Sequence, residues 1–142
     1  MNATSAATAS AVTFVWLGMV LAISFLEAPL KFRAPGVTVP IGLGIGRIVF
    51  RALNAVESAL AVVVIAAVAL GGGTPGVTVL TAAVAVVLLV QLAVVRPRLG
   101  RRSDRVLAGE DLPRSRGHLW YVALEFLKAV VLVGLGVALL TV

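Results

Sequence analysis

Ionisable side chains lie inside stretches of this sequence that are otherwise apolar. Glu27 and Lys31 close the first stretch, Glu57 lies in the second, and Glu125 and Lys128 lie in the last. An ion in apolar surroundings is costly unless it is paired, so such residues tend to face the inside of a fold and to serve a function. Carboxylates and cations placed in this way could bind an ion or a small charged solute, or relay a proton.

The spacing of the polar residues places them on shared helix faces. Glu27 and Lys31 stand four apart, in the favourable order for a helical ion pair, with Pro29 between them. A 4-3-4 spacing predicts one stripe in the second stretch: Arg47, Arg51, Asn54 and Ser58. Glu57 lies roughly 60° round that helix from Asn54. A 3-4-3 spacing predicts another stripe in the last stretch: His118, Tyr121, Glu125 and Lys128.

The elements that carry these residues have the composition of membrane spans. Of the 142 residues, 61% are hydrophobic and 13% are charged, whereas soluble domains are about half apolar and about a quarter charged. A bilayer core about 30 Å thick needs about 20 mostly apolar residues per helix. Four stretches qualify, at about 11–30, 46–70, 77–95 and 119–142. We therefore expect an all-α integral membrane protein, with one four-helix bundle over residues 1–142.

The basic residues predict how the bundle is oriented. Eleven of the twelve Lys and Arg residues lie between residues 31 and 51 or between residues 96 and 116. Positive residues favour the cytoplasmic side, so both termini are expected on the non-cytoplasmic side of the inner (plasma) membrane. We expect residues 96–117 to form a solvated cytoplasmic loop that touches anionic lipid headgroups. No aromatic residue lies among its arginines to stack on bases, so we expect no nucleic-acid partner.

Helix geometry puts the polar residues at similar depths. At about 1.5 Å per residue, Glu57 lies about 15 Å beyond Arg47, and Glu125 lies about 10 Å beyond His118. Both positions fall in the cytoplasmic half of the bundle. Gln91, the one strongly polar residue of the third span, is expected at the same level.

Two interpretations of this cluster remain open. It could be a paired network that fixes how the helices dock, or a polar cavity that is open to the cytoplasm and binds an ion or small solute. A net positive lining would favour an anion, with Arg47 and Arg51 binding it and with Glu57 and Glu125 relaying protons or counter-charge. Because four helices are few for a pathway, such a protein would act as a homo-oligomer. The other class of function is a non-catalytic accessory or assembly subunit of a larger membrane complex.

Several other chemistries are not expected. The chain has no Cys, one His and two Met, so no disulfide, transition-metal site or cofactor is predicted. No Ser-His-Asp arrangement with sensible roles occurs, and we expect no enzyme. Gly42 and Gly46 do not have the spacing of a nucleotide-binding loop. Their spacing either allows close helix approach or gives a flexible entry to the second span. Trp16, near the middle of its span, is expected to serve in packing.

Short motifs in the same order resemble a known family. They are WLG at residues 16–18, APLKF at 28–32, GRIVF at 46–50 and RPRL at 96–99, with His118 opening the fourth span. This layout resembles small four-span bacterial membrane proteins of unknown function, of the transmembrane-protein-two-hundred-and-five type, and more distantly copper-resistance D-type membrane domains. The resemblance implies the four-span fold and leaves the function open. Glu57, Glu125 and Lys128 are additional to the family pattern, and the lack of Cys argues against a copper role.

Overall fold

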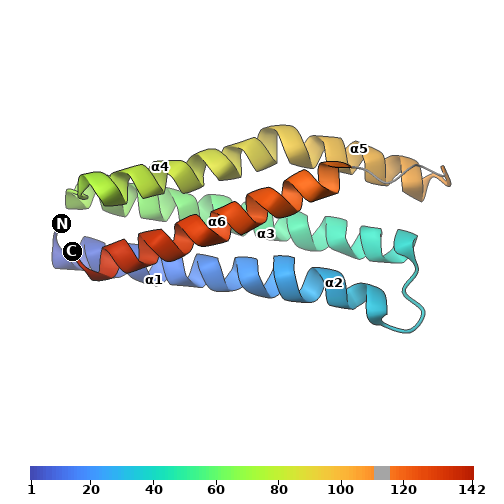
Figure 1. The fold of residues 1–142 in the computed structure, drawn as a ribbon, viewed down its shortest axis with the longest axis horizontal. Coiled ribbons are helices and arrows are strands. Elements are labelled where there is room, and N and C mark those ends of the chain that lie inside the picture. The colour runs from blue at the N-terminus through green and yellow to red at the C-terminus, as the bar shows by residue number, and fades with distance from the viewer. Residues whose placement is uncertain (111–115) are drawn as a thin grey trace.

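The computed structural model describes residues 1–110 and 116–142, and for residues 116–118 it describes the backbone alone. Throughout the described part the regular elements are helices, and no strand occurs there. They form four long rods that lie side by side, with both chain ends at the same end of the bundle (Figure 1). Each rod contains a helix long and apolar enough to cross a membrane, as the sequence predicts.

The first rod is a helix of changing pitch. It consists of α1 (Ala3–Val20), a π-helical segment η1 (Leu21–Glu27), the single turn α2 (Ala28–Leu30) and a 3₁₀ turn η2 (Lys31–Arg33). Its start lies earlier than the expected residue 11, because the Asn2 side chain caps the helix by accepting a hydrogen bond of 2.8 Å from the Ser5 N–H.

The second rod is one helix, α3 (Val39–Gly71). It also begins before the expected residue 46, since Thr38 caps its first turn and Pro40 fits the first positions of a helix, where no N–H is needed. The helix ends at Gly71 and is capped by Gly72, whose φ of 72° is the left-handed conformation that glycine adopts without strain.

The third rod consists of α4 (Pro75–Val90), a second π-helical segment η3 (Gln91–Val95) and α5 (Arg96–Leu107). The expectation of a loop beginning at residue 96 is wrong for 96–107, where the helix continues. A proline normally clashes with the carbonyl four residues before it, and for Pro97 that carbonyl belongs to Ala93, inside the wider π turn. The π turn therefore lets the helix continue past the proline into the arginine-rich stretch.

The same relation holds in the first rod. Pro29 follows η1, and the residue four positions before it, Phe25, lies inside that π-helical segment. Prolines and π turns both distort or kink a helix locally. Each of the two π-helical segments thus has a proline two residues beyond its end.

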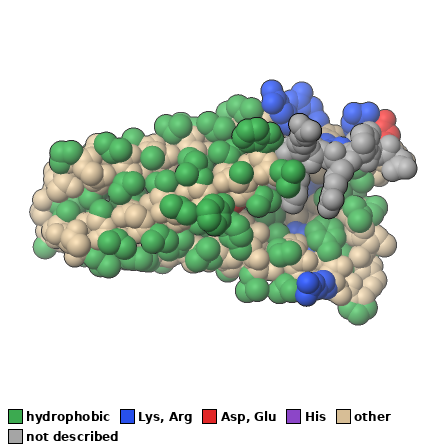
Figure 2. Space-filling model, in the orientation of Figure 1, with side chains coloured by type: hydrophobic (Ala, Val, Ile, Leu, Met, Phe, Trp, Pro, Cys, Tyr) green, Lys and Arg blue, Asp and Glu red, His purple; other side chains and the backbone are tan. Residues whose placement is uncertain are grey.

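The fourth rod, α6 (Arg116–Leu140), completes the bundle: α1 packs against α3 and α6, and α4 packs against α6. Toward the chain ends its interior is apolar, with Val64, Val77, Leu132 and Leu135 all buried. The visible Lys and Arg side chains gather at the opposite end (Figure 2), which we call the basic end. The molecule is therefore an apolar bundle with one charged end.

Candidate functional site

Two carboxylates and one ammonium group meet inside the bundle. The Nζ atom of Lys128 lies 2.6 Å from Oε2 of Glu57 and 2.6 Å from Oε1 of Glu125. The side chains of Lys128 and Glu57 are fully buried, and that of Glu125 is 2% exposed. Glu125 and Lys128 stand three apart on α6, whereas Glu57 reaches them from α3. The structure therefore brings these three predicted site residues together.

Uncharged donors and acceptors complete this cluster. Gln91 donates through Nε2 to Oε1 of Glu125 at 2.7 Å and accepts at Oε1 from Lys128 at 2.8 Å. The Ser24 hydroxyl donates to Oε2 of Glu125 at 2.6 Å, and the Trp16 indole donates to Oε2 of Glu57 at 2.7 Å. The buried network is the set of these six residues: Trp16, Ser24, Glu57, Gln91, Glu125 and Lys128. All four rods contribute to it.

The π-helical segments supply two members of the network. Ser24 lies within η1 and Gln91 is the first residue of η3. A π turn adds one residue to a helical turn and so changes the direction in which its side chains point. Such turns are frequent at functional sites, and both of those in the described chain lie at the level of the network.

A cavity lies between the buried network and the basic end. Its volume is about 470 Å³, and Ser24 and Glu125 form part of its lining together with Tyr121. Much of the remaining wall is apolar, including Phe25, Phe32, Leu43, Leu99 and Val122. A cavity of this size falls in the range that binds small molecules, about 300–1,000 Å³.

In the part of the chain whose side chains are described, three cations line the same cavity: Lys31, Arg47 and Arg96. The guanidinium carbon of Arg96 lies 5.2 Å from the centroid of the Phe50 ring and 5.5 Å from that of Tyr121. The Lys31 ammonium lies 5.6 Å from the Phe50 centroid, on which Arg96 also stacks. Aromatic faces attract cations at these distances and so hold them in place. We call this space, with its three cations, the basic cavity.

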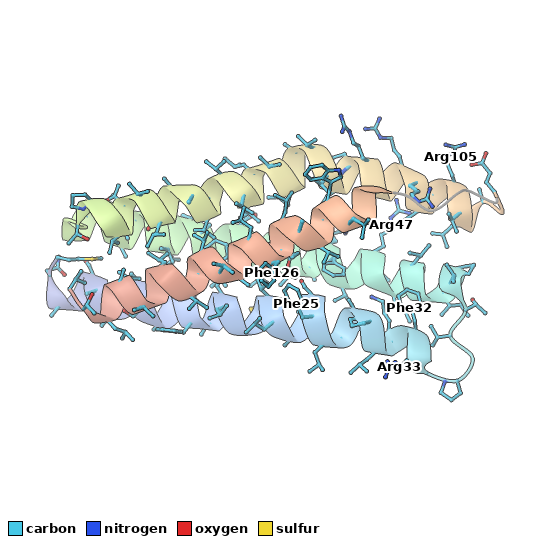
Figure 3. All side chains as sticks on the ribbon, in the orientation of Figure 1. Phe25, Phe32, Arg33, Arg47, Arg105 and Phe126 are labelled. Carbon is cyan, nitrogen blue, oxygen red and sulfur yellow. The ribbon has the colours of Figure 1, made fainter. Side chains whose placement is uncertain are left out.

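Two glycines of α3 allow the cavity wall to close. A Cβ atom added at Gly42 would lie 2.1 Å from Cε1 of Phe32, and one at Gly46 would lie 2.9 Å from Nζ of Lys31. The side chains of Phe32 and Lys31 therefore lie close against α3 at these two glycines. In Figure 3 Phe32 lies beside the first turns of α3, while Arg33 points away from the other helices.

Ion pairs lie near the basic end, one within the first rod and one between α3 and α5. Glu27 and Lys31 lie 3.7 Å apart, as the four-residue spacing predicts. Arg47 pairs with Asp104 of α5, and Figure 3 shows Arg47 between α3 and α5. Asp104 lies in the stretch that the sequence analysis treats as loop, so this partner was not foreseen.

The other predicted site residues fall in different places. Arg51 is exposed and does not line the basic cavity, because its position on α3 turns it away from the bundle interior. Asn54 is buried, and its backbone carbonyl accepts a hydrogen bond from the Ser58 hydroxyl. The hydroxyl of Tyr121 is buried without a hydrogen-bond partner. The side chain of His118 lies outside the described residues.

Sequence reasoning missed Trp16, Ser24 and Arg96 as members of the site. Trp16 was expected to serve in packing alone, yet its indole N–H bonds to Glu57. The available signals were the pairing of a mid-span Trp with a mid-span Glu, and the position of Ser24 and Arg96 close to helix-distorting prolines. Among the described residues, no group of three or more His, Cys, Asp or Glu side chains is placed to hold a metal ion.

A comparison of the chain with protein-family models, with curated proteins and with solved structures finds no match. The resemblance drawn from the short motifs stays a prediction.

Proposed function

We propose that this multi-pass membrane protein binds a small anionic solute with an apolar part in its basic cavity. The observation that carries the proposal is the composition of the cavity: three cations, Lys31, Arg47 and Arg96, beside apolar walls. Among the described residues that line it, Glu125 is the one acid, and that carboxylate is already bonded to Lys128, Gln91 and Ser24. Charge complementarity therefore favours an anion.

The apolar walls restrict the kind of anion. Phe25, Phe32, Leu43, Leu99 and Val122 offer no hydrogen-bonding side chain to a second polar group. A carboxylate or phosphate that carries a short hydrocarbon chain would satisfy both parts of the cavity. An inorganic ion would meet the cations and leave the apolar wall without a ligand.

Orientation and assembly belong to the same proposal. From the positive-inside rule we expect the basic end, and hence the cavity, on the cytoplasmic side of the inner membrane, with both termini outside. The half of the bundle toward the chain ends is packed with buried apolar side chains. The proposal is therefore binding from the cytoplasmic side. Movement of the solute across the membrane would require a homo-oligomer or a second conformation.

A binding assay in nanodiscs of neutral lipid tests the proposal. The probes are octyl phosphate, inorganic phosphate, and octyltrimethylammonium as a cation with the same chain, each measured by the shift in melting temperature and by calorimetry. We expect octyl phosphate to bind best, and Arg96→Gln to weaken its binding about tenfold, equivalent to about 1.4 kcal/mol. Arg51→Gln is the matched control, since it removes an exposed arginine outside the cavity. Equal binding of the cationic probe, or an equal effect of Arg51→Gln, contradicts the proposal.

The alternative function is an accessory subunit of a larger membrane complex, and helix α5 favours it. Arg98, Arg101 and Arg105 are exposed on this helix, and Figure 3 shows Arg105 at its far end. This basic surface could dock onto an acidic partner or onto anionic headgroups. Native mass spectrometry after gentle extraction separates the two functions. A stoichiometric complex with a larger protein favours the accessory role, and a small bound anion favours the proposed one.

A further inference from the structure

We propose that the buried network is a binding site for one proton, carried on Oε1 of Glu57 and shared through Lys128 with Glu125. This inference goes beyond the proposed function and does not depend on it, since it concerns the network with the basic cavity empty. It rests on three features: the charge balance of the network, the hydrogen bonds of each carboxylate oxygen, and burial.

The charge balance is uneven. Glu57 and Glu125 share one ammonium group, that of Lys128, at 2.6 Å from each. With all three groups ionised, the network would hold one uncompensated negative charge on side chains that are at most 2% exposed. An uncompensated buried charge is strongly unfavourable, and a bound proton removes it.

Among the residues whose side chains the structure describes, the neighbouring elements do not supply the missing positive charge. From the first rod the network receives Trp16 and Ser24, and from η3 it receives Gln91, all uncharged. The cations nearer the basic end have other partners: Lys31 pairs with Glu27, Arg47 pairs with Asp104, and Arg96 stacks on Phe50 and Tyr121. Arg51 on α3 is exposed. Tyr121 on α6 is neutral as a phenol and has no hydrogen-bond partner.

The hydrogen bonds indicate which atom carries the proton. Both oxygens of Glu125 accept hydrogen bonds, Oε1 from Gln91 and Oε2 from Ser24, which is the pattern of an ionised carboxylate. Glu57 differs, because Oε2 meets both Trp16 and Lys128 while Oε1 is buried with no partner. A neutral Glu57 with its carbonyl at Oε2 and its hydroxyl at Oε1 matches this asymmetry. Lys128 and Glu125 then form a neutral ion pair.

The site is connected to the basic cavity. Lys128 touches both carboxylates, and Glu125 lies on the cavity lining beside Ser24. Lys128 contacts Oε2 of Glu57, so the proton on Oε1 reaches it when the Glu57 carboxyl group rotates and brings its hydroxyl to the ammonium. Lys128 then gives one proton to Glu125 and takes the proton of Glu57, and Glu125 releases its proton to the cavity, with no group needed from outside the network. The proton is the only species gained or lost in this step.

Infrared spectroscopy of the protein in nanodiscs at neutral pH tests the inference. We expect a carboxylic-acid carbonyl band that shifts in heavy water and on labelling of the glutamates with carbon-13. Glu57→Gln should remove the band. Glu125→Gln should remove it too, because Glu57 then becomes the counterion of Lys128. Glu27→Gln is the matched control, since Glu27 is paired with Lys31 outside the network, and this variant should keep the band.

Two results would overturn the inference. One is the absence of a glutamic-acid band from the unmodified protein, which would mean that both carboxylates are ionised. The other is a band that persists in Glu57→Gln and also in Glu125→Gln, which would place the acid elsewhere. The labelled, unmodified protein decides the first point even if a variant fails to fold.

Discussion

Trp16 and Glu57 are 41 positions apart in the sequence, yet the Trp16 indole Nε1 donates a hydrogen bond of 2.7 Å to Oε2 of Glu57. Both side chains are fully buried, and the bond joins α1 to α3. An indole in the middle of a membrane span thus serves as a donor to a buried acid, in addition to its packing role. The relation ties the first rod to the network that the other rods share.

Replacing Trp16 by Phe should lower the stability of the bundle. The change removes the N–H donor together with part of the buried ring, so Glu57 loses a buried hydrogen bond at a cost of about 1–3 kcal/mol and the lost packing adds to that cost. Unfolding in mixed detergent micelles measures the loss. Trp120→Phe is the control, because Trp120 is 66% exposed. A loss of equal size in both variants would show that the donor has no special role.

The two carboxylates should be replaceable one at a time but not together. Either Glu57→Gln or Glu125→Gln leaves Lys128 with one counterion, whereas the double variant leaves its ammonium buried and unpaired. Breaking a buried pair in this way costs about 3–5 kcal/mol, so we expect the double variant to lose far more than the sum of the single changes. The test is a double-mutant cycle of the unfolding free energies of the unmodified protein, the two single variants and the double variant. Losses that simply add would contradict the prediction. Adding Lys128→Met to the double variant should restore much of the stability.

The glycines at the start of α3 should differ in their tolerance of a methyl group. Gly42→Ala should destabilise the protein and disturb the cavity, because the new Cβ would collide with the Phe32 ring at 2.1 Å. Gly44→Ala is the matched control: no atom lies within 4 Å of its added Cβ, and alanine favours a helix over glycine by about 0.5–1 kcal/mol. Melting temperatures should therefore fall for the first variant and stay level or rise for the second. The reverse order would mean that α3 and η2 are not in contact.

Asp104→Asn should strengthen anion binding at the basic cavity. Asp104 pairs with Arg47, a cavity cation, and competes with any anion for it. We expect affinity for octyl phosphate to rise about threefold, since an exposed ion pair is worth about 0–1 kcal/mol. Glu110→Gln is the control, as it breaks the Arg105–Glu110 pair of 2.7 Å, whose residues do not line the cavity. No gain in the Asp104 variant, or the same gain in both, would exclude Arg47 from the binding surface.

Residue spacing predicted contacts within one helix, but it did not predict contacts between helices. The Glu27–Lys31 pair follows from a separation of four residues, and it is present at 3.7 Å. The polar stripe on α3 did not indicate which side of the helix faces the bundle interior. Glu57, which lies off that stripe, reaches the buried network, while Arg51, which lies on it, is exposed. A helix rotates about 100° per residue, so a stripe fixes relative directions and packing against other helices decides which direction is buried.

The π-helical segments were beyond the reach of the sequence analysis for a related reason. Pro29 and Pro97 mark positions where a helix is distorted. A proline can equally kink a helix or end it, so its presence does not by itself predict a π turn. In the structure each proline follows a π-helical segment, and these segments direct Ser24 and Gln91 toward Glu125. Residues 96–107 then continue as helix, where their high charge had suggested a loop.

The division of the network among the four rods bears on how the chain is assembled during synthesis. Glu125 and Lys128 are neighbours on one helix, so the last span carries its own counterion as it leaves the ribosome and enters the lipid. Glu57 belongs to the second span, and its partner Lys128 is translated 71 residues later. Until then Trp16, already inserted, is the network member available to bond with it. The first two spans can therefore remain paired as a helical hairpin until the fourth span is inserted and completes the bundle.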